Sequence, residues 1–297
     1  MEHIETRTAD PQYPAQRRSG LGVLGSGAAG VLALGAAVTL LLSGAPARAE
    51  TLKAHYSLSL IGFSIGSAYA SGVVEPQNYR VDISMKTTGL ANLVNNTKGA
   101  ASASGGINAD GPAPASYANT TSNNDESRTV RMSLSANAVR ALDVKPEPWD
   151  AAVRVPVSES NKRRILDPVS ALIMSVPSGQ PLTGPSACNR TIPVFDGVTR
   201  FDVRLVFVET RMVRTNGYEG PVSVCAARYT PIAGYRPDSS STKYMAENHD
   251  MDVWLAPMPN AHVVVPYRID IRTSAGMLVI DAADFHIGQR QANSQDQ

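Results

Sequence analysis

The sequence has few of the residues that catalytic and metal sites use. It contains two cysteines and five histidines among 297 residues, and aromatic residues make up only 6%. It has no H-E-x-x-H metal motif and no glycine-rich phosphate loop. Basic and acidic residues nearly balance, at 27 and 26, so no excess of positive charge points to nucleic acid. We therefore predict no catalytic residues, no metal ligands, no cofactor and no nucleic-acid partner.

The first part of the chain has the three features of an export signal. Arg17 and Arg18 precede the apolar stretch 21–42, and an Ala-Arg-Ala cleavage site ends at Ala49. We expect cleavage between Ala49 and Glu50. An uncleaved membrane anchor is the alternative, since about 20 apolar residues can span a bilayer. The stretch is rich in glycine and alanine, however, and the cleavage site lies at the usual place.

The export route is left open by these residues. The arginine pair suggests twin-arginine export, but Gly20 stands where an apolar residue is usual, and the general secretory route fits equally well. Either route predicts a periplasmic protein. Cys188 and Cys225 would then form one disulfide. A pair of buried thiols or a metal site is the alternative, although two cysteines without a nearby histidine make a poor zinc site.

Alternation of apolar and other residues dominates the chain after residue 50. A spacing of two predicts strands with one buried face. The runs are 52–60, 61–65, 79–85, 130–134, 201–207, 222–224, 253–255, 263–271 and 277–279. Turn residues separate many of them, so neighbouring strands are expected to pair antiparallel. We predict an all-β fold with a single curled antiparallel sheet, either an open barrel or a β-spiral.

One short amphipathic helix is predicted over residues 167–176. Asp167 suits the N-cap and Pro168 the first helical position. Leu172 and three other apolar residues would share one face of this helix and dock on the sheet. A second, weaker helix is predicted over residues 90–94.

The expected organisation is a cleaved signal peptide over residues 1–49, one β domain over 50–288 and a disordered polar tail over 289–297. Residues 99–125 are rich in glycine, alanine, serine and asparagine. They fit either a mobile loop or strands of small residues.

The stretch GFSIG at residues 62–66 matches the G-x-S-x-G pattern of a nucleophile elbow. That motif needs a strand, a sharp turn that holds the serine, and then a helix. After Ser64, two glycines within the seven residues 66–72 disfavour a helix there. We therefore interpret GFSIG as a strand made flexible by Gly62 and Gly66. Its bare face of small residues would abut a neighbouring element or leave space for a ligand.

Two further groups of residues are weaker site candidates. His249, Asp250 and Asp252 could bind a metal, but two carboxylates on one strand face are more often solvated surface. Trp254 and other aromatic residues could line a pocket, and core packing explains them equally well. The candidate cleft positions are Gly62, Ser64, Gly66, Asp167, Leu172 and Trp254.

Several spaced motifs together resemble one protein family. They are Tyr56-x-x-x-Leu60-x-Gly62-x-x-x-Gly66, Asp167-Pro168-x-Ser170-Ala171-Leu172, Pro193-x-Phe195-Asp196-Gly197, Arg200-Phe201-Asp202, Tyr218-x-Gly220 and Pro266-Tyr267-Arg268. Over residues 50–288 the chain resembles an exported proteobacterial domain-of-unknown-function family, number three thousand one hundred and eight, of the alphaproteobacterial type. The resemblance implies no reaction and no active residues. In architecture the expected sheet resembles periplasmic lipoprotein carriers, which hold hydrophobic groups in a concave face.

These observations predict a periplasmic, non-enzymatic protein of the cell envelope. It would bind a lipid-like or peptide partner in the concave face of the curled sheet, and that partner would be an envelope lipid or an envelope protein. A structural scaffold of the envelope is the alternative, and a hydrolase that uses Ser64 is a third. The sequence does not give the oligomeric state.

Overall fold

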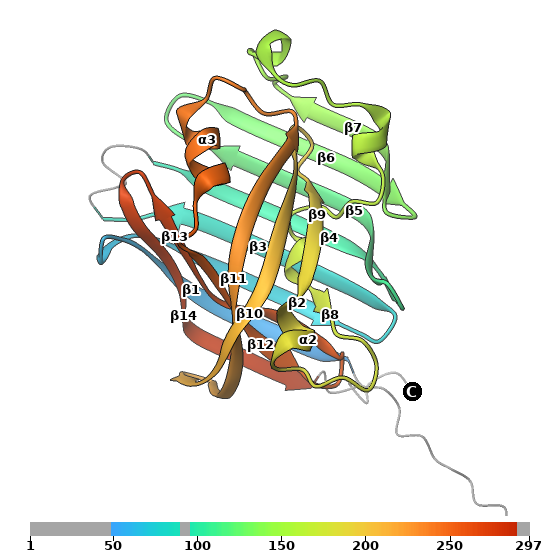
Figure 1. Ribbon diagram of the computed structural model, residues 1–297, viewed down its shortest axis with the longest axis vertical. Coiled ribbons are helices and arrows are strands. Elements are labelled where there is room, and N and C mark those ends of the chain that lie inside the picture. Colours follow the sequence, from blue (N-terminus) through green and yellow to red (C-terminus); the bar gives the residue numbers. More distant parts are fainter. Residues whose placement is uncertain (1–48, 90–95, 290–297) are drawn as a thin grey trace, which may run out of the picture. The chain divides into compact units, whose positions relative to one another are not determined.

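The computed structural model describes residues 49–89 and 96–289 and shows one large antiparallel sheet (Figure 1). Its strands are β1 (Glu50–Leu60), β2 (Phe63–Val74), β3 (Asn78–Thr87), β4 (Lys98–Asn108), β5 (Gly111–Ser122), β6 (Ser127–Ser135), β7 (Ala138–Lys145), β8 (Met174–Ser175), β9 (Arg190–Phe195), β10 (Arg200–Thr215), β11 (Tyr218–Ala233), β12 (Met251–Met258), β13 (Val263–Thr273) and β14 (Gly276–Gln289). The predicted all-β fold with a single antiparallel sheet is confirmed.

The order of the strands follows the chain in two halves. Strands β1 to β7 pair in sequence order, and so do β9 to β14. Pairing between β1 and β14 joins the halves, while the short β8 lies off this path and pairs with β13.

The sheet curls, but its edge strands β7 and β9 do not pair with each other. The segment 163–166 lies between these edges. Arg163 forms a bridge with Ala138 of β7, and Leu166 forms one with Val194 of β9. In the view of Figure 1, β10 and β11 cross in front of strands from the first half. The result is an open, barrel-like sheet.

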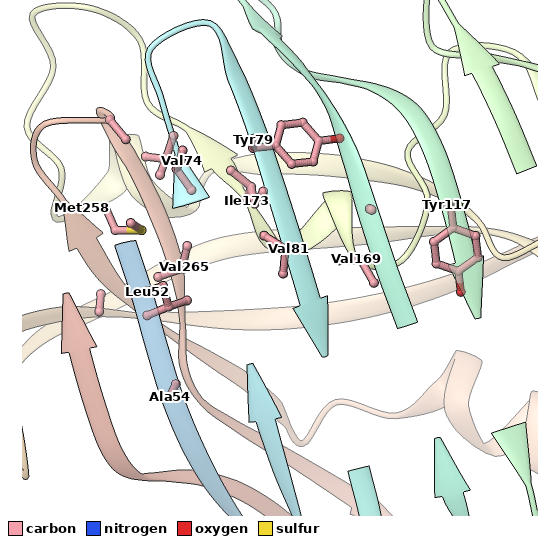
Figure 2. Close-up of a cluster of buried hydrophobic side chains, with 14 of the residues drawn as sticks. Leu52, Ala54, Val74, Tyr79, Val81, Tyr117, Val169, Ile173, Met258 and Val265 are labelled. Atoms are coloured by element: carbon pink, nitrogen blue, oxygen red, sulfur yellow. The ribbon is translucent and has the colours of Figure 1, made fainter. Parts of the chain in front are cut away.

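The main hydrophobic core fills the inner face of this curled sheet (Figure 2). Because side chains alternate along a strand, the inner face of β1, β3 and β5 carries the buried residues of each strand. The labelled core residues are Leu52, Ala54, Val74, Tyr79, Val81, Tyr117, Val169, Ile173, Met258 and Val265. Each fully buried large aliphatic side chain stabilises the fold by about 1.5–3 kcal/mol.

The helix predicted over 167–176 is much shorter in the structure. Only one 3-10 turn, η3 (Ser170–Leu172), forms, and the chain is extended from Ile173 into β8. The N–H of Val176 donates to the carbonyl of His262 at 3.2 Å. The backbone N–H and C=O groups of residues 174–176 therefore bond to β13 and His262, and in a longer helix they would have bonded within the helix.

Other helices were not predicted. The longest in the described part is α3 (Ser240–Glu247), whose N-cap Ser239 accepts a hydrogen bond from a backbone N–H of the first turn. The shorter ones are α2 (Pro185–Cys188), η1 (Ala151–Val153) and η2 (Glu159–Lys162).

Residues 99–125, which the sequence left open, lie almost wholly in β4 and β5. The helix predicted over 90–94 falls outside the described residues. So do residues 1–48 of the expected signal peptide and 290–297 of the expected tail, whereas Gln289 ends β14.

The expected cleavage site falls directly before the sheet, because Glu50 begins β1. Its carboxylate is buried and accepts a hydrogen bond from the N–H of Ala261 at 2.9 Å. In the part of the chain that the structure describes, no helix is long and apolar enough to cross a membrane.

The predicted disulfide is confirmed. Cys188, at the end of α2, is bonded to Cys225 of β11, and the two Cα atoms lie 5.5 Å apart. Both residues are fully buried in a second hydrophobic cluster, which lies between β9–β13 and residues 171–188.

Candidate functional site

The GFSIG stretch contains a hairpin turn rather than a continuous strand. Ile61 and Gly62 have φ angles of 52° and 81° and form the two-residue turn between β1 and β2. Ser64 lies in β2, exposed, with further strand after it instead of a helix. A Cβ at Gly66 would lie 2.6 Å from the Lys86 carbonyl oxygen, so close approach of β3 requires glycine there. Gly62 therefore belongs to the turn, while Gly66 abuts the neighbouring strand β3.

Replacing Ile61 with asparagine should stabilise the protein. A β-branched residue is strained at positive φ, and asparagine is favoured in this turn. Ile61 is 63% exposed, so little packing is lost, and we expect the free energy of unfolding to rise by about 1 kcal/mol. Urea denaturation measures this. The matched control is Phe63→Asn, also exposed but in strand conformation; equal effects of the two changes would contradict the strain at Ile61.

The other predicted cleft residues separate in the structure. Asp167 is fully buried and acts as an N-terminal acceptor for the η3 turn. Leu172 lines an apolar cavity. The Trp254 ring instead lies beneath the guanidinium groups of Arg211 and Arg268, each 5.1 Å from its centroid.

The two acidic residues near position 250 have different surroundings. Asp250 accepts a hydrogen bond from Arg272 Nε at 2.8 Å. Asp252 lies opposite Asp270 in the register of β12 and β13. Over residues 49–89 and 96–289, no group of three or more His, Cys, Asp or Glu side chains is placed to hold a metal ion.

An apolar cavity of about 270 Å³ is the best-formed candidate site. It lies between the face of β9–β13 and the segment from Pro168 to Met174, and Met245 of α3 also lines it. Further lining residues are Val194, Phe201, Val203, Leu205, Ala227, Tyr229, Met251, Val253, Ile269 and Ile271.

Strand register explains why this face is continuously apolar. Val203 pairs with Tyr229 and Leu205 with Ala227 across β10 and β11. Because residues opposite each other point to the same side, neighbouring strands extend one apolar surface. Burial raises the pKa of the Tyr229 hydroxyl, and the nearby Asp196 carboxylate and Tyr235 hydroxyl raise it further.

The rim of the apolar cavity is acidic. Asp252 and Asp270 both line it. Desolvation raises the pKa of Asp252, and the facing charge of Asp270 raises it further. Asp270 forms an ion pair with Arg268, whose Nε lies 3.0 Å from its Oδ1, so the charge of this carboxylate is balanced within the protein.

A larger hollow of about 680 Å³, with many polar side chains, lies on the outer face of β1–β5, opposite the face that carries the main core. Tyr69 there stacks on His55 with ring centroids 4.4 Å apart, and His55 Nδ1 lies 3.4 Å from Asp284 Oδ2. These groups satisfy one another at an exposed surface.

Comparison with known proteins identifies the family. A family model described as "Protein of unknown function (DUF3108)" matches residues 53–283. The chain belongs to this family. No curated protein matches the chain. Among solved structures, it is similar to a β-barrel-like protein of domain of unknown function DUF1849 from Brucella abortus, with 11% identity and a TM-score of 0.47 over 81% of this chain and 99% of that one.

Every residue that lines the apolar cavity falls within the DUF3108 match. The sequence anticipated Leu172 of this set. Tyr229 was among the aromatic residues that could line a pocket. The aliphatic lining from β10 to β13 was predicted only as strands, without the space between them and the 168–174 segment.

Proposed function

We propose that this DUF3108 protein is a non-enzymatic periplasmic protein of the cell envelope that binds a lipid-like ligand in the apolar cavity. The observation that carries the proposal is the cavity itself, with its lining of aliphatic, methionine and aromatic side chains. Its volume is near the lower end of the about 300–1,000 Å³ range of small-molecule sites. Export is supported by the buried disulfide, because such bonds persist in oxidising compartments.

The elements that cover the cavity suit entry of a flexible chain. One is the single turn η3 with its flanking residues, and the other is the two-turn helix α3, whose Met245 reaches the lining. Short elements of this kind have little stability of their own. Methionine side chains at Met174, Met245 and Met251 adapt to ligands of varied shape.

Filling the cavity should abolish binding. We expect Ala227→Phe, which places a ring in the cavity, to weaken binding of the neutral fluorescent probe N-phenyl-1-naphthylamine by at least about tenfold, or ~1.4 kcal/mol. Val253→Phe is a second variant, should the first fold poorly. Fluorescence titration of the purified proteins measures the effect.

The matched control is Val206→Phe, at an exposed site next to Leu205 in β10. Unchanged probe binding in both cavity variants, or equal loss in the control, would contradict ligand binding in this cavity. Mass spectrometry of protein purified from native periplasm, without detergent, should in addition find co-purifying lipid.

A scaffold function is the second candidate and has one observation in its favour. Trp149 is 84% exposed and Val153 is 58% exposed, close together in the chain, and exposed aromatic residues are enriched where proteins bind one another. Co-purification of a protein instead of lipid would favour this function.

A further inference from the structure

A second cavity, of about 500 Å³, adjoins the apolar one and is lined by two arginines, Arg164 and Arg190. Three residues, Ala171, Met174 and Ile192, line both cavities. The two spaces are therefore neighbours, separated by a few side chains, one of which is an adaptable methionine.

Arg190 is a half-buried cation whose guanidinium donates to two backbone carbonyls. Its Nη1 donates to the carbonyl of Ser175 at 2.8 Å and its Nη2 to the carbonyl of Ser186 at 2.7 Å. Its Nε is buried and has no hydrogen-bond partner in the described part of the chain. No carboxylate forms an ion pair with it there either, and desolvation lowers its pKa. A desolvated charge of this kind is stabilised by an opposite charge.

Arg164 is held in an unfavourable backbone conformation at the same cavity. Its φ is 53°, a region that glycine and asparagine enter at lower cost. The bridges of Arg163 to Ala138 and of Leu166 to Val194 hold the chain on both sides of it. An exposed arginine in such a strained position suggests a use for its side chain.

The charged side chains that line this second cavity sum to a net positive charge. Asp110 is the single carboxylate in the lining, and it forms no ion pair with either arginine among the residues described. The Ser175 hydroxyl is buried there, likewise without a partner. Together, two guanidinium groups and one hydroxyl supply donors suited to a phosphate or carboxylate.

We propose that the arginine-lined cavity binds the phosphate or carboxylate group of an anionic amphiphile whose hydrocarbon chain occupies the apolar cavity. This rests on the proposed function, and it adds the chemical class and orientation of the ligand. Asp252 and Asp270 line the apolar cavity itself, and Asp270 is already paired with Arg268. The arginine-lined cavity lies next to the apolar one, past Met174, and offers the opposite charge.

The test compares two ligands with one chain length, dodecyl phosphate and dodecanol, as competitors of N-phenyl-1-naphthylamine. We expect the phosphate to compete at least about tenfold better, because hydrogen bonds from arginine to an anion are stronger than those to a neutral hydroxyl. Arg164→Asn, which suits the positive φ, should reduce this preference by about tenfold while dodecanol competes as before. Arg190→Gln should reduce it further. Arg140→Asn, on exposed β7, is the matched control and should leave the preference unchanged.

Equal competition by the two ligands in the wild-type protein would overturn the headgroup site while leaving the apolar site intact. Absence of probe binding altogether would instead contradict the proposed function. In that case inorganic phosphate alone is titrated and followed by amide shifts in NMR spectra. Shifts around residues 164 and 190 that Arg164→Asn abolishes would support an anion site for free phosphate, and their absence would overturn the site.

Discussion

Replacing Asp167 with alanine is expected to lower the free energy of unfolding by about 3–5 kcal/mol. Its carboxylate accepts hydrogen bonds from the backbone N–H groups of Val169 and Ser170, at 3.0 and 2.9 Å, and from the Ser170 hydroxyl. Tyr79 extends this buried network, with its hydroxyl 2.6 Å from that of Ser170. Alanine would leave three buried donors without an acceptor. Urea denaturation, followed by circular dichroism, measures the loss.

Asp167→Asn is the matched control, because its amide oxygen can still accept the two backbone hydrogen bonds. It should cost much less than alanine. An ordinary exposed N-cap contributes about 1 kcal/mol to stability. If the alanine variant lost less than that, the network would not stabilise the η3 segment.

The asparagine variant also makes a prediction about pH. Burial raises the pKa of the Asp167 carboxyl, and hydrogen bonds from Ser170 and Val169 offset only part of this. The native state therefore holds this proton more tightly than the unfolded state does. The stability from this group is fully present below the unfolded pKa and is lost as pH rises through the folded pKa. Stability of the asparagine variant relative to wild type should thus increase from about pH 4, near the unfolded value, to neutral pH.

Removing the disulfide should have an effect of similar size. Cys188 and Cys225 are 37 residues apart in sequence, and opening a loop of that length costs about 4 kcal/mol in the chain-entropy model. The variant with both residues changed to alanine avoids burying new hydroxyl groups in the core. The urea midpoint of unfolding should be lower for this variant than for the wild type. Dithiothreitol should lower the midpoint of the wild type and leave that of the variant unchanged. A change smaller than about 1 kcal/mol would show that the reduced chain retains the contacts between α2 and β11.

How far the sequence predicted the structure depends on the element. Period-two alternation predicted the strands well, since burial of one face is a local property of the pattern. The same alternation gave no sign of the turn between β1 and β2, because Ile61 continues an apolar run and isoleucine is unusual in a turn. The spacing of Val169, Leu172 and Ile173 fits a helix, yet hydrogen bonds from distant β13 and the side chain of Asp167 favour one 3-10 turn and a strand.

The sites were harder to predict because they depend on distant contacts. The apolar cavity forms where residues 168–174 meet strands that follow some 20 to 100 positions later. Arg163 and Arg164 belong to a short basic run, and both are exposed. What the sequence could not show is that Arg164 and Arg190 line one cavity. The one sequence signal for this cavity was Arg190, an arginine at the start of the apolar strand β9.

The pairing of β1 with β14 affects how the chain folds as it is made. Hydrogen bonds such as that from the Thr51 hydroxyl to the Gly288 carbonyl join residues 237 positions apart. Strand β1 can pair with β2 early, but its other edge has no partner until the last strand has left the ribosome. Such long-range pairing is slow, and an unpaired edge invites association with other chains. The new chain would therefore depend most on chaperones just before its final strand arrives.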